Sequence, residues 1–157
     1  MPVIRLETSI AAPIERCFDL MRDVEVHTQS TARTRERAVG GVTTGILKEG
    51  DEVTWEAVHF GVRQRLTVKV VRCEPPRLFE DAKVRGAFKA FNHLHEFRAV
   101  PGGTQMIDTF RYRSPLGPLG AIADRLFLTR YMRSFLERRA RFLKERAESE
   151  ARQHAEP

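Results

Sequence analysis

The chain has 157 residues, of which 41% are hydrophobic and 31% are charged. This size and balance are typical of one soluble globular domain with a buried core. No apolar run approaches the length of a membrane-spanning helix. The first strand-like segment carries Arg5 and Glu7 where a signal peptide would have an unbroken apolar stretch. We therefore expect a cytoplasmic protein without a membrane span. Cys17 and Cys73 lie in unrelated segments without metal-ligand spacing, which indicates reduced thiols.

The formal net charge is +6, from 27 basic and 21 acidic residues. Much of the excess lies in residues 130–146, and a basic helix of this kind can bind nucleic acid or an anionic membrane surface. Glu137, Glu145, Glu148 and Glu150 are interleaved with the basic residues. This interleaving favours a solvated helix face, so we expect no nucleic-acid partner.

Alternating apolar residues predict strands, which we place, in chain order, at residues 3–10, 31–39, 51–60, 62–70, 78–84, 88–97 and 106–112. Helical spacing predicts a helix that opens at Ala12-Pro13 and one long amphipathic helix at residues 119–148. Residues 27–30 fit a short helix or a loop, and residues 40–50 a loop or a weak edge. An antiparallel sheet with one apolar face must bury that face, and the long helix offers the matching surface.

The pattern predicts the register of one hairpin but leaves the inward face of another strand open. If Phe60-Gly61 is a two-residue turn, His59 pairs with Val62 and Trp55 with Leu66, and the apolar halves of both strands share one face. The strand at residues 78–84 keeps two alternatives. A tight turn after residues 74–77 points Phe79 and Asp81 inward, whereas a slip of one residue points Leu78, Glu80 and Ala82 inward.

The hairpin that follows carries an unusual inner face. Side chains alternate along a strand, so one face collects Phe91, His93, His95, Phe97, Met106, Asp108, Phe110 and Tyr112. An ordinary core would be purely apolar at these positions. Two imidazoles and a carboxylate among aromatic rings indicate the wall of a ligand cavity.

Several segments resemble the SRPBCC superfamily, also called START-like or Bet v 1-like, and most closely its polyketide cyclase/dehydrase-type proteins. The resemblance covers roughly residues 3–147, and its segments are 9–13, 50–55, 57–61, 75–81, 86–88, 93–97, 103–104, 108 and 115–120. It implies an α+β helix-grip fold, in which a curved antiparallel β-sheet wraps around a long C-terminal α-helix. It also implies a cavity for lipids, polyketides or other apolar molecules, and it transfers no catalytic residue. We expect a single domain at residues 1–150 and a polar, disordered tail at 151–157.

We therefore predict binding of a hydrophobic small molecule, such as a lipid, a polyketide-like compound or an isoprenoid, between sheet and helix. The predicted ligand-binding residues are Trp55, His59, Leu66, Asp81, His93, His95, Phe97, Phe110, Tyr112, Phe127 and Tyr131. The alternative is a cyclase or dehydratase in which His59, His93 or His95 removes a proton and Tyr112 or Asp108 steers a carbonyl.

Two further kinds of site are compatible with the pattern. His93 and His95 are spaced as two metal ligands on a strand, with His59, Asp81 or Asp108 as the third, but polar groups lining a pocket are the plainer interpretation. We expect no metal and no cofactor. Arg33, Arg35 and Arg37 could bind a carboxylate or phosphate, although a solvated sheet edge is the favoured explanation. The ligand and the oligomeric state, including a possible homodimer, stay open.

Overall fold

The computed structural model describes residues 2–114, 117–123 and 127–155. In chain order its elements are β1 (Val3–Ile10), α1 (Ile14–Met21), α2 (Val24–Ser30), a short 3-10 helix (Ala32–Thr34), β2 (Arg37–Gly41), β3 (Glu52–His59), β4 (Val62–Glu74), β5 (Leu78–Gly86), β6 (Ala90–Val100), β7 (Gly103–Arg113), α3 (Gly117–Ala123) and α4 (Thr129–Ala155). The predicted α+β architecture is confirmed. Within the described residues, no helix is long and apolar enough to cross a membrane.

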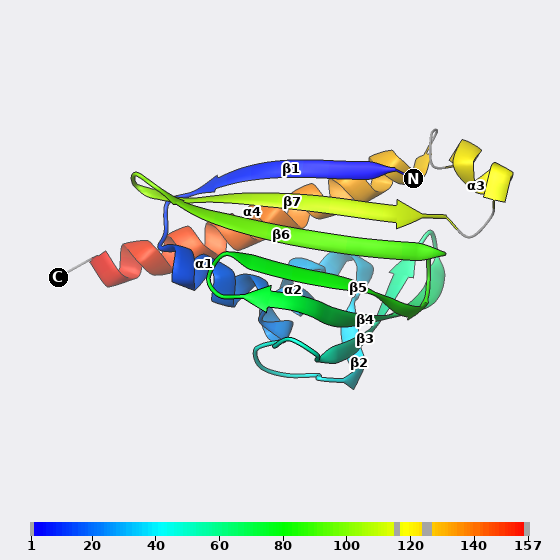
Figure 1. The fold of residues 1–157 in the computed structure, drawn as a ribbon, viewed down its shortest axis with the longest axis horizontal. Coiled ribbons are helices and arrows are strands. Elements are labelled where there is room, and N and C mark those ends of the chain that lie inside the picture. Colours follow the sequence, from blue (N-terminus) through cyan, green and yellow to red (C-terminus); the bar gives the residue numbers. More distant parts are fainter. Residues whose placement is uncertain (1, 115–116, 124–126, 156–157) are drawn as a thin grey trace.

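The strands form one antiparallel sheet in the order β1-β7-β6-β5-β4-β3-β2. Figure 1 shows this curved sheet with α4 crossing behind β1, β7 and β6, and with α1 and α2 on the same side as α4. From β2 to β7 consecutive strands are neighbours in the sheet, which keeps their connections short, and β1 pairs with β7. The sheet therefore packs against α4 on one face.

Strand registers agree with the hairpin predictions. Trp55 pairs with Leu66 and His59 with Val62, because the Phe60-Gly61 turn has left-handed backbone angles at both residues, with φ values of 53° and 74°. Such a turn matches the twist of the two strands, and glycine takes the second position without strain. The apolar faces of β3 and β4 consequently point toward α4.

The inward parity of β5 is now fixed. Arg77 donates its backbone N–H to the Glu74 carbonyl, which closes the tight turn before β5. Phe79 is buried, and Asp81 lies directly opposite His93 of β6. The alternative that points Leu78 and Glu80 inward is therefore wrong.

Several predicted boundaries differ from the structure. The strand expected at residues 31–39 begins only at Arg37, because Thr31 and Thr34 donate their hydroxyls to backbone carbonyls and continue α2 into the 3-10 helix. The region of the long helix expected at 119–148 contains two described helices, α3 and α4. Residues 124–126 lie outside the described residues. α4 continues to Ala155, so residues 151–155 are helical rather than a disordered tail.

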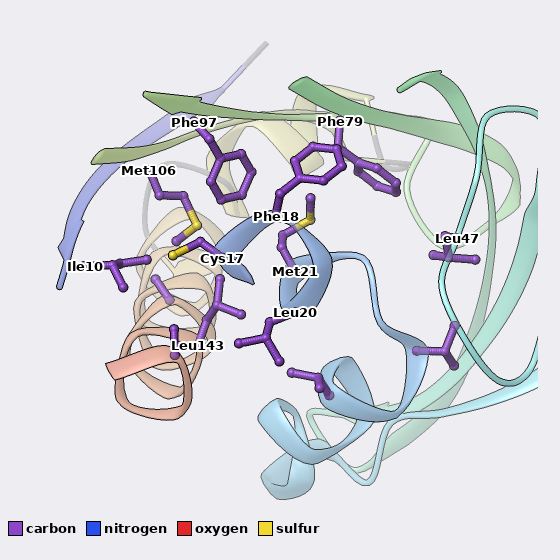
Figure 2. Packing of buried hydrophobic residues seen from close by; sticks show 14 of the residues in the cluster. Ile10, Cys17, Phe18, Leu20, Met21, Leu47, Phe79, Phe97, Met106 and Leu143 are labelled. Carbon is purple, nitrogen blue, oxygen red and sulfur yellow. The ribbon is translucent and has the colours of Figure 1, made fainter. Parts of the chain in front are cut away.

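The core fills one end of the space between sheet and helix. Figure 2 shows Cys17 of α1 between Phe97 of the sheet and Leu143 of α4, with Phe18 and Met21 of α1 beside it toward Phe79. Phe18 meets Phe97 edge to face at 5.5 Å between ring centroids. Because α1 covers this part of the sheet, the C-terminal half of α4 packs against α1, and its N-terminal half is left to face the remaining sheet.

Candidate functional site

A cavity of about 260 Å³ lies between the sheet and the N-terminal half of α4. Its walls are mainly apolar and aromatic, with a few polar groups among them. Eight of the predicted ligand-binding residues border it: Trp55, His59, Leu66, Asp81, His93, His95, Phe110 and Tyr131. The parity of the strands brings these side chains together, since every one of the strand residues in this set points toward α4.

Three predicted site residues lie elsewhere. Phe97 is part of the core beside Phe18, because α1 fills that end of the sheet. Tyr112 is fully buried near the start of α4, where its hydroxyl lies 2.8 Å from the Thr129 hydroxyl. Phe127 precedes the regular part of α4 and is 70% exposed. The cavity-facing stripe of the helix begins one residue later, at Leu128.

A half-buried polar chain was not predicted from the sequence. Arg139 Nη2 lies 2.7 Å from His27 Nδ1, and His27 Nε2 lies 2.5 Å from Glu36 Oε1. The His27 ring also stacks on Trp55 at 4.0 Å. Burial lowers the pKa of His27; burial alone would raise the pKa of Glu36, but His27 holds it below its usual value. The one available signal was Arg139, which sits among apolar residues of the helix stripe.

A second polar group links β6 and β7. His95 Nδ1 lies 2.5 Å from Asp108 Oδ1, and the two residues are direct register partners. The exposed fractions of His93, His95 and Asp108 are only 3%, 5% and 6%. Burial lowers the pKa of His93 to about 3, so this imidazole is neutral at neutral pH. Burial alone would raise the pKa of Asp108, but the adjacent His95 charge holds it well below its usual value.

Asp81 contrasts with these paired groups. It makes no hydrogen bond or ion pair with any residue that the structure describes, and its Oδ1 atom is buried without a partner. Burial raises the pKa of this carboxyl to about 6, although the charges of His95 and Arg139 act in the opposite direction. An unpaired carboxyl on a mainly apolar wall is the kind of group that a ligand satisfies.

Residues of the β3–β4 turn and of α4 also border the cavity. His59 Nδ1 lies 2.5 Å from the Tyr131 hydroxyl, and Phe60 packs on the Tyr131 ring at 4.6 Å while remaining 66% exposed. Burial lowers the pKa of His59. Arg33, Arg35 and Arg37 are exposed outside the cavity, so they supply no anion site within it.

This arrangement defines a protein class: a curved antiparallel sheet that grips a long C-terminal helix over an internal cavity is the helix-grip fold of the SRPBCC superfamily. Residues 1–148 match the family described as polyketide cyclase / dehydrase and lipid transport, and the chain belongs to that family. No curated protein matches the sequence.

Solved structures agree on the fold. The protein TTHA0849 from Thermus thermophilus has a TM-score of 0.78 at 20% identity, with 96% of this chain and 99% of that chain covered. Protein CV1439 from Chromobacterium violaceum has a TM-score of 0.71 at 12% identity, covering 93% and 96%. Major latex-like protein 151 from Panax ginseng has a TM-score of 0.64 at 13% identity, covering 93% and 97%. At these identities the likeness shows the fold alone.

Proposed function

We propose that the protein binds a compact, mainly apolar small molecule that carries a hydroxyl or another hydrogen-bond donor. The observation that carries the proposal is the unpaired Asp81 carboxyl on the wall of an apolar cavity. Desolvating a ligand donor inside such a cavity costs free energy unless an acceptor is present, and Asp81 supplies that acceptor. Apolar contacts would supply affinity, and Asp81 would fix orientation.

The cavity volume narrows the ligand class. Small-molecule sites span about 300 to 1,000 Å³, and a cavity of about 260 Å³ lies just below that range. A polyketide-like aromatic or a short isoprenoid alcohol fits this space better than a two-chain lipid. Aromatic side chains from β6, β7 and α4, namely Phe91, Phe110 and Phe135, favour flat rings, because offset and edge-on ring contacts add to simple burial.

Binding can be tested directly. Thermal-shift and fluorescence titrations would compare naphthols, short isoprenoid alcohols and the same skeletons without the hydroxyl. We expect the hydroxylated compounds to raise the melting temperature most. Asp81→Leu should remove that preference, whereas Glu52→Gln, at an exposed position of β3, should retain it. If no compound binds and native mass spectrometry finds no co-purified molecule, the proposal fails.

A second candidate is a cyclase or dehydratase reaction in the same cavity. The geometry favours Asp81 as its proton acceptor over His59 and His95, because His59 is hydrogen-bonded to Tyr131 and His95 to Asp108. A carboxylate within reach of a bound ketone would remove a proton from the adjacent carbon. Exchange of that proton in deuterated water, slowed at least about tenfold in Asp81→Asn, would support catalysis. Ligand binding without proton exchange would indicate a carrier and not an enzyme.

A further inference from the structure

His93, His95 and Asp108 offer one ligand atom each within 4.8 Å of one another. The two histidines are separated by one residue on β6, so their side chains leave the same face of the strand. Asp108 is the register partner of His95 on β7. The sequence allowed three candidates for the third ligand. Asp108 is the one that lies near both imidazoles, whereas His59 is hydrogen-bonded to Tyr131.

His93 has a nitrogen that the protein itself leaves unused. Its Nε2 atom is buried without a hydrogen-bond partner in the described structure. The nearest acceptor, Asp108 Oδ1, lies 3.6 Å away, which is too long for a hydrogen bond. An unpaired nitrogen at such depth costs stability, because nothing replaces the water that it loses on folding. Packing alone does not explain why the His93 Nε2 atom lies unpaired beside a carboxylate.

The charges around the cluster also suit a bound cation. The ion-pair partners of Asp108 within the described residues are the two imidazoles. Arg139 contacts His27, and that imidazole in turn contacts Glu36, so the guanidinium charge is matched by a different carboxylate. Buried carboxylates are normally paired with a cation or coordinate a metal.

Space is present beside the three side chains. A second, smaller cavity of about 30 Å³ borders His93, His95 and Asp108 on the α4 side of the sheet. This is comparable with the volume of one water molecule. The two imidazoles border the large cavity as well, whereas Asp108 borders only the small one. An ion bound by all three side chains would lie beside the small cavity, next to the wall of the large one.

We propose that His93, His95 and Asp108 bind one divalent transition-metal ion of the zinc or ferrous type. Two imidazoles and one carboxylate form the donor set of open zinc sites and of mononuclear iron sites, which leave further positions for water or a ligand. The metal site depends on the cluster alone and is independent of the proposed small-molecule function.

The ligand atoms lie within 4.8 Å of one another and must adjust to hold one ion. Ligand atoms about 2.0 to 2.2 Å from a tetrahedral zinc ion lie about 3.4 Å apart. The His93 to Asp108 distance of 3.6 Å already fits, and the His95 to Asp108 distance of 2.5 Å must lengthen. The ion takes the place of the hydrogen bond between His95 and Asp108. A charged His95 would release its proton to solvent, whereas a neutral His95 would move its proton to the other ring nitrogen, and no group changes its oxidation state.

The test uses the full chain, stripped of metal with a chelator and titrated with Co²⁺ and Zn²⁺. We expect one ion per chain, visible Co²⁺ absorption of a site with nitrogen and oxygen ligands, and displacement by Zn²⁺. His93→Gln should weaken binding by more than about 100-fold. This variant breaks no hydrogen bond of the structure, so it should fold even if Asp108→Asn does not.

Two controls make the assignment specific. His154→Gln, near the end of α4 and exposed, should leave metal affinity unchanged. His59→Gln removes a cavity histidine outside the cluster and should change it less than threefold. If the stripped protein takes up no stoichiometric ion, or if His93→Gln binds as tightly as the wild type, the metal site is refuted. A loss in His59→Gln equal to that in His93→Gln would refute this set of ligands.

Discussion

Replacing Asp81 with asparagine should stabilise the protein at high pH and leave its stability almost unchanged at low pH. The carboxyl lies unpaired beside the cavity, and burial raises its pKa from 3.8 to about 6. The folded protein therefore holds a proton that the unfolded chain has already released between about pH 4 and 6. The contribution of Asp81 to the free energy of unfolding falls as the pH rises through this window, and it stays low above it.

A shift of about two pKa units corresponds to about 3 kcal/mol. Asp81 retains some accessible surface toward the cavity, where water screens its charge, so we expect about 2 kcal/mol. Asparagine has nearly the same shape and no charge. The difference in unfolding free energy between Asp81→Asn and the wild type should therefore be near zero at pH 4 and about 2 kcal/mol in favour of the variant at pH 8.

Urea unfolding of both proteins at a series of pH values, with a chelator present, measures this difference. Comparing the two curves cancels the opposite contributions of Asp108 and Glu36, whose pKa values are lowered in the fold. Glu52→Gln, on the exposed face of β3, is the matched control and should give a flat difference. An Asp81→Asn difference that is equally large at pH 4 and pH 8 would refute the argument, because it could not come from ionisation of this carboxyl.

The remaining predictions concern core packing, a close backbone approach and one hydrogen bond. Phe97→Ala should cost about 3 to 5 kcal/mol in urea unfolding, whereas Phe127→Ala, with an exposed ring, should change stability by less than about 0.5 kcal/mol; equal effects would contradict the placement of the two rings. Gly103→Ala should prevent stable folding as measured by circular dichroism, since its Cβ would collide with a carbonyl oxygen of β1, and a normal melting temperature would be the contrary result. Tyr131→Phe should cost about 1 kcal/mol and shift the NMR resonances of the His59 ring, because their hydrogen bond is lost; an unchanged His59 spectrum would show that the bond is absent in solution.

Much of the fold could be predicted because it depends on local patterns. Alternation placed the β6–β7 hairpin and its two faces correctly, and the Phe60-Gly61 turn fixed the register of β3 and β4. Prediction failed where side chains compete with the backbone for hydrogen bonds. Thr31 and Thr34 satisfy carbonyls at the end of α2, and that local competition turned a plausible strand into a 3-10 helix.

The candidate site was predictable to the extent that it lies on strands. Parity assigns His93, His95 and Asp108 to one face without any knowledge of the helix. The helix contribution was harder, because a residue on a long apolar stripe can face either a cavity or a packed core. Phe127 and Tyr131 were indistinguishable by pattern, and the structure exposes the first and places the second against His59.

The sequence by itself determined the strands along the chain and the inward faces of the hairpins, because side-chain alternation and turn geometry are properties of neighbouring residues. Its resemblance to a known superfamily implied the helix-grip class. Only the tertiary structure decided which inward residues border empty space and which are packed. α1 fills one end of the sheet with Phe18 and Met21, and this places Phe97 in the core while Asp81 is left unpaired beside a cavity. Burial and pairing arise from elements distant in the chain, and they change the chemistry of a carboxyl that no local pattern distinguishes.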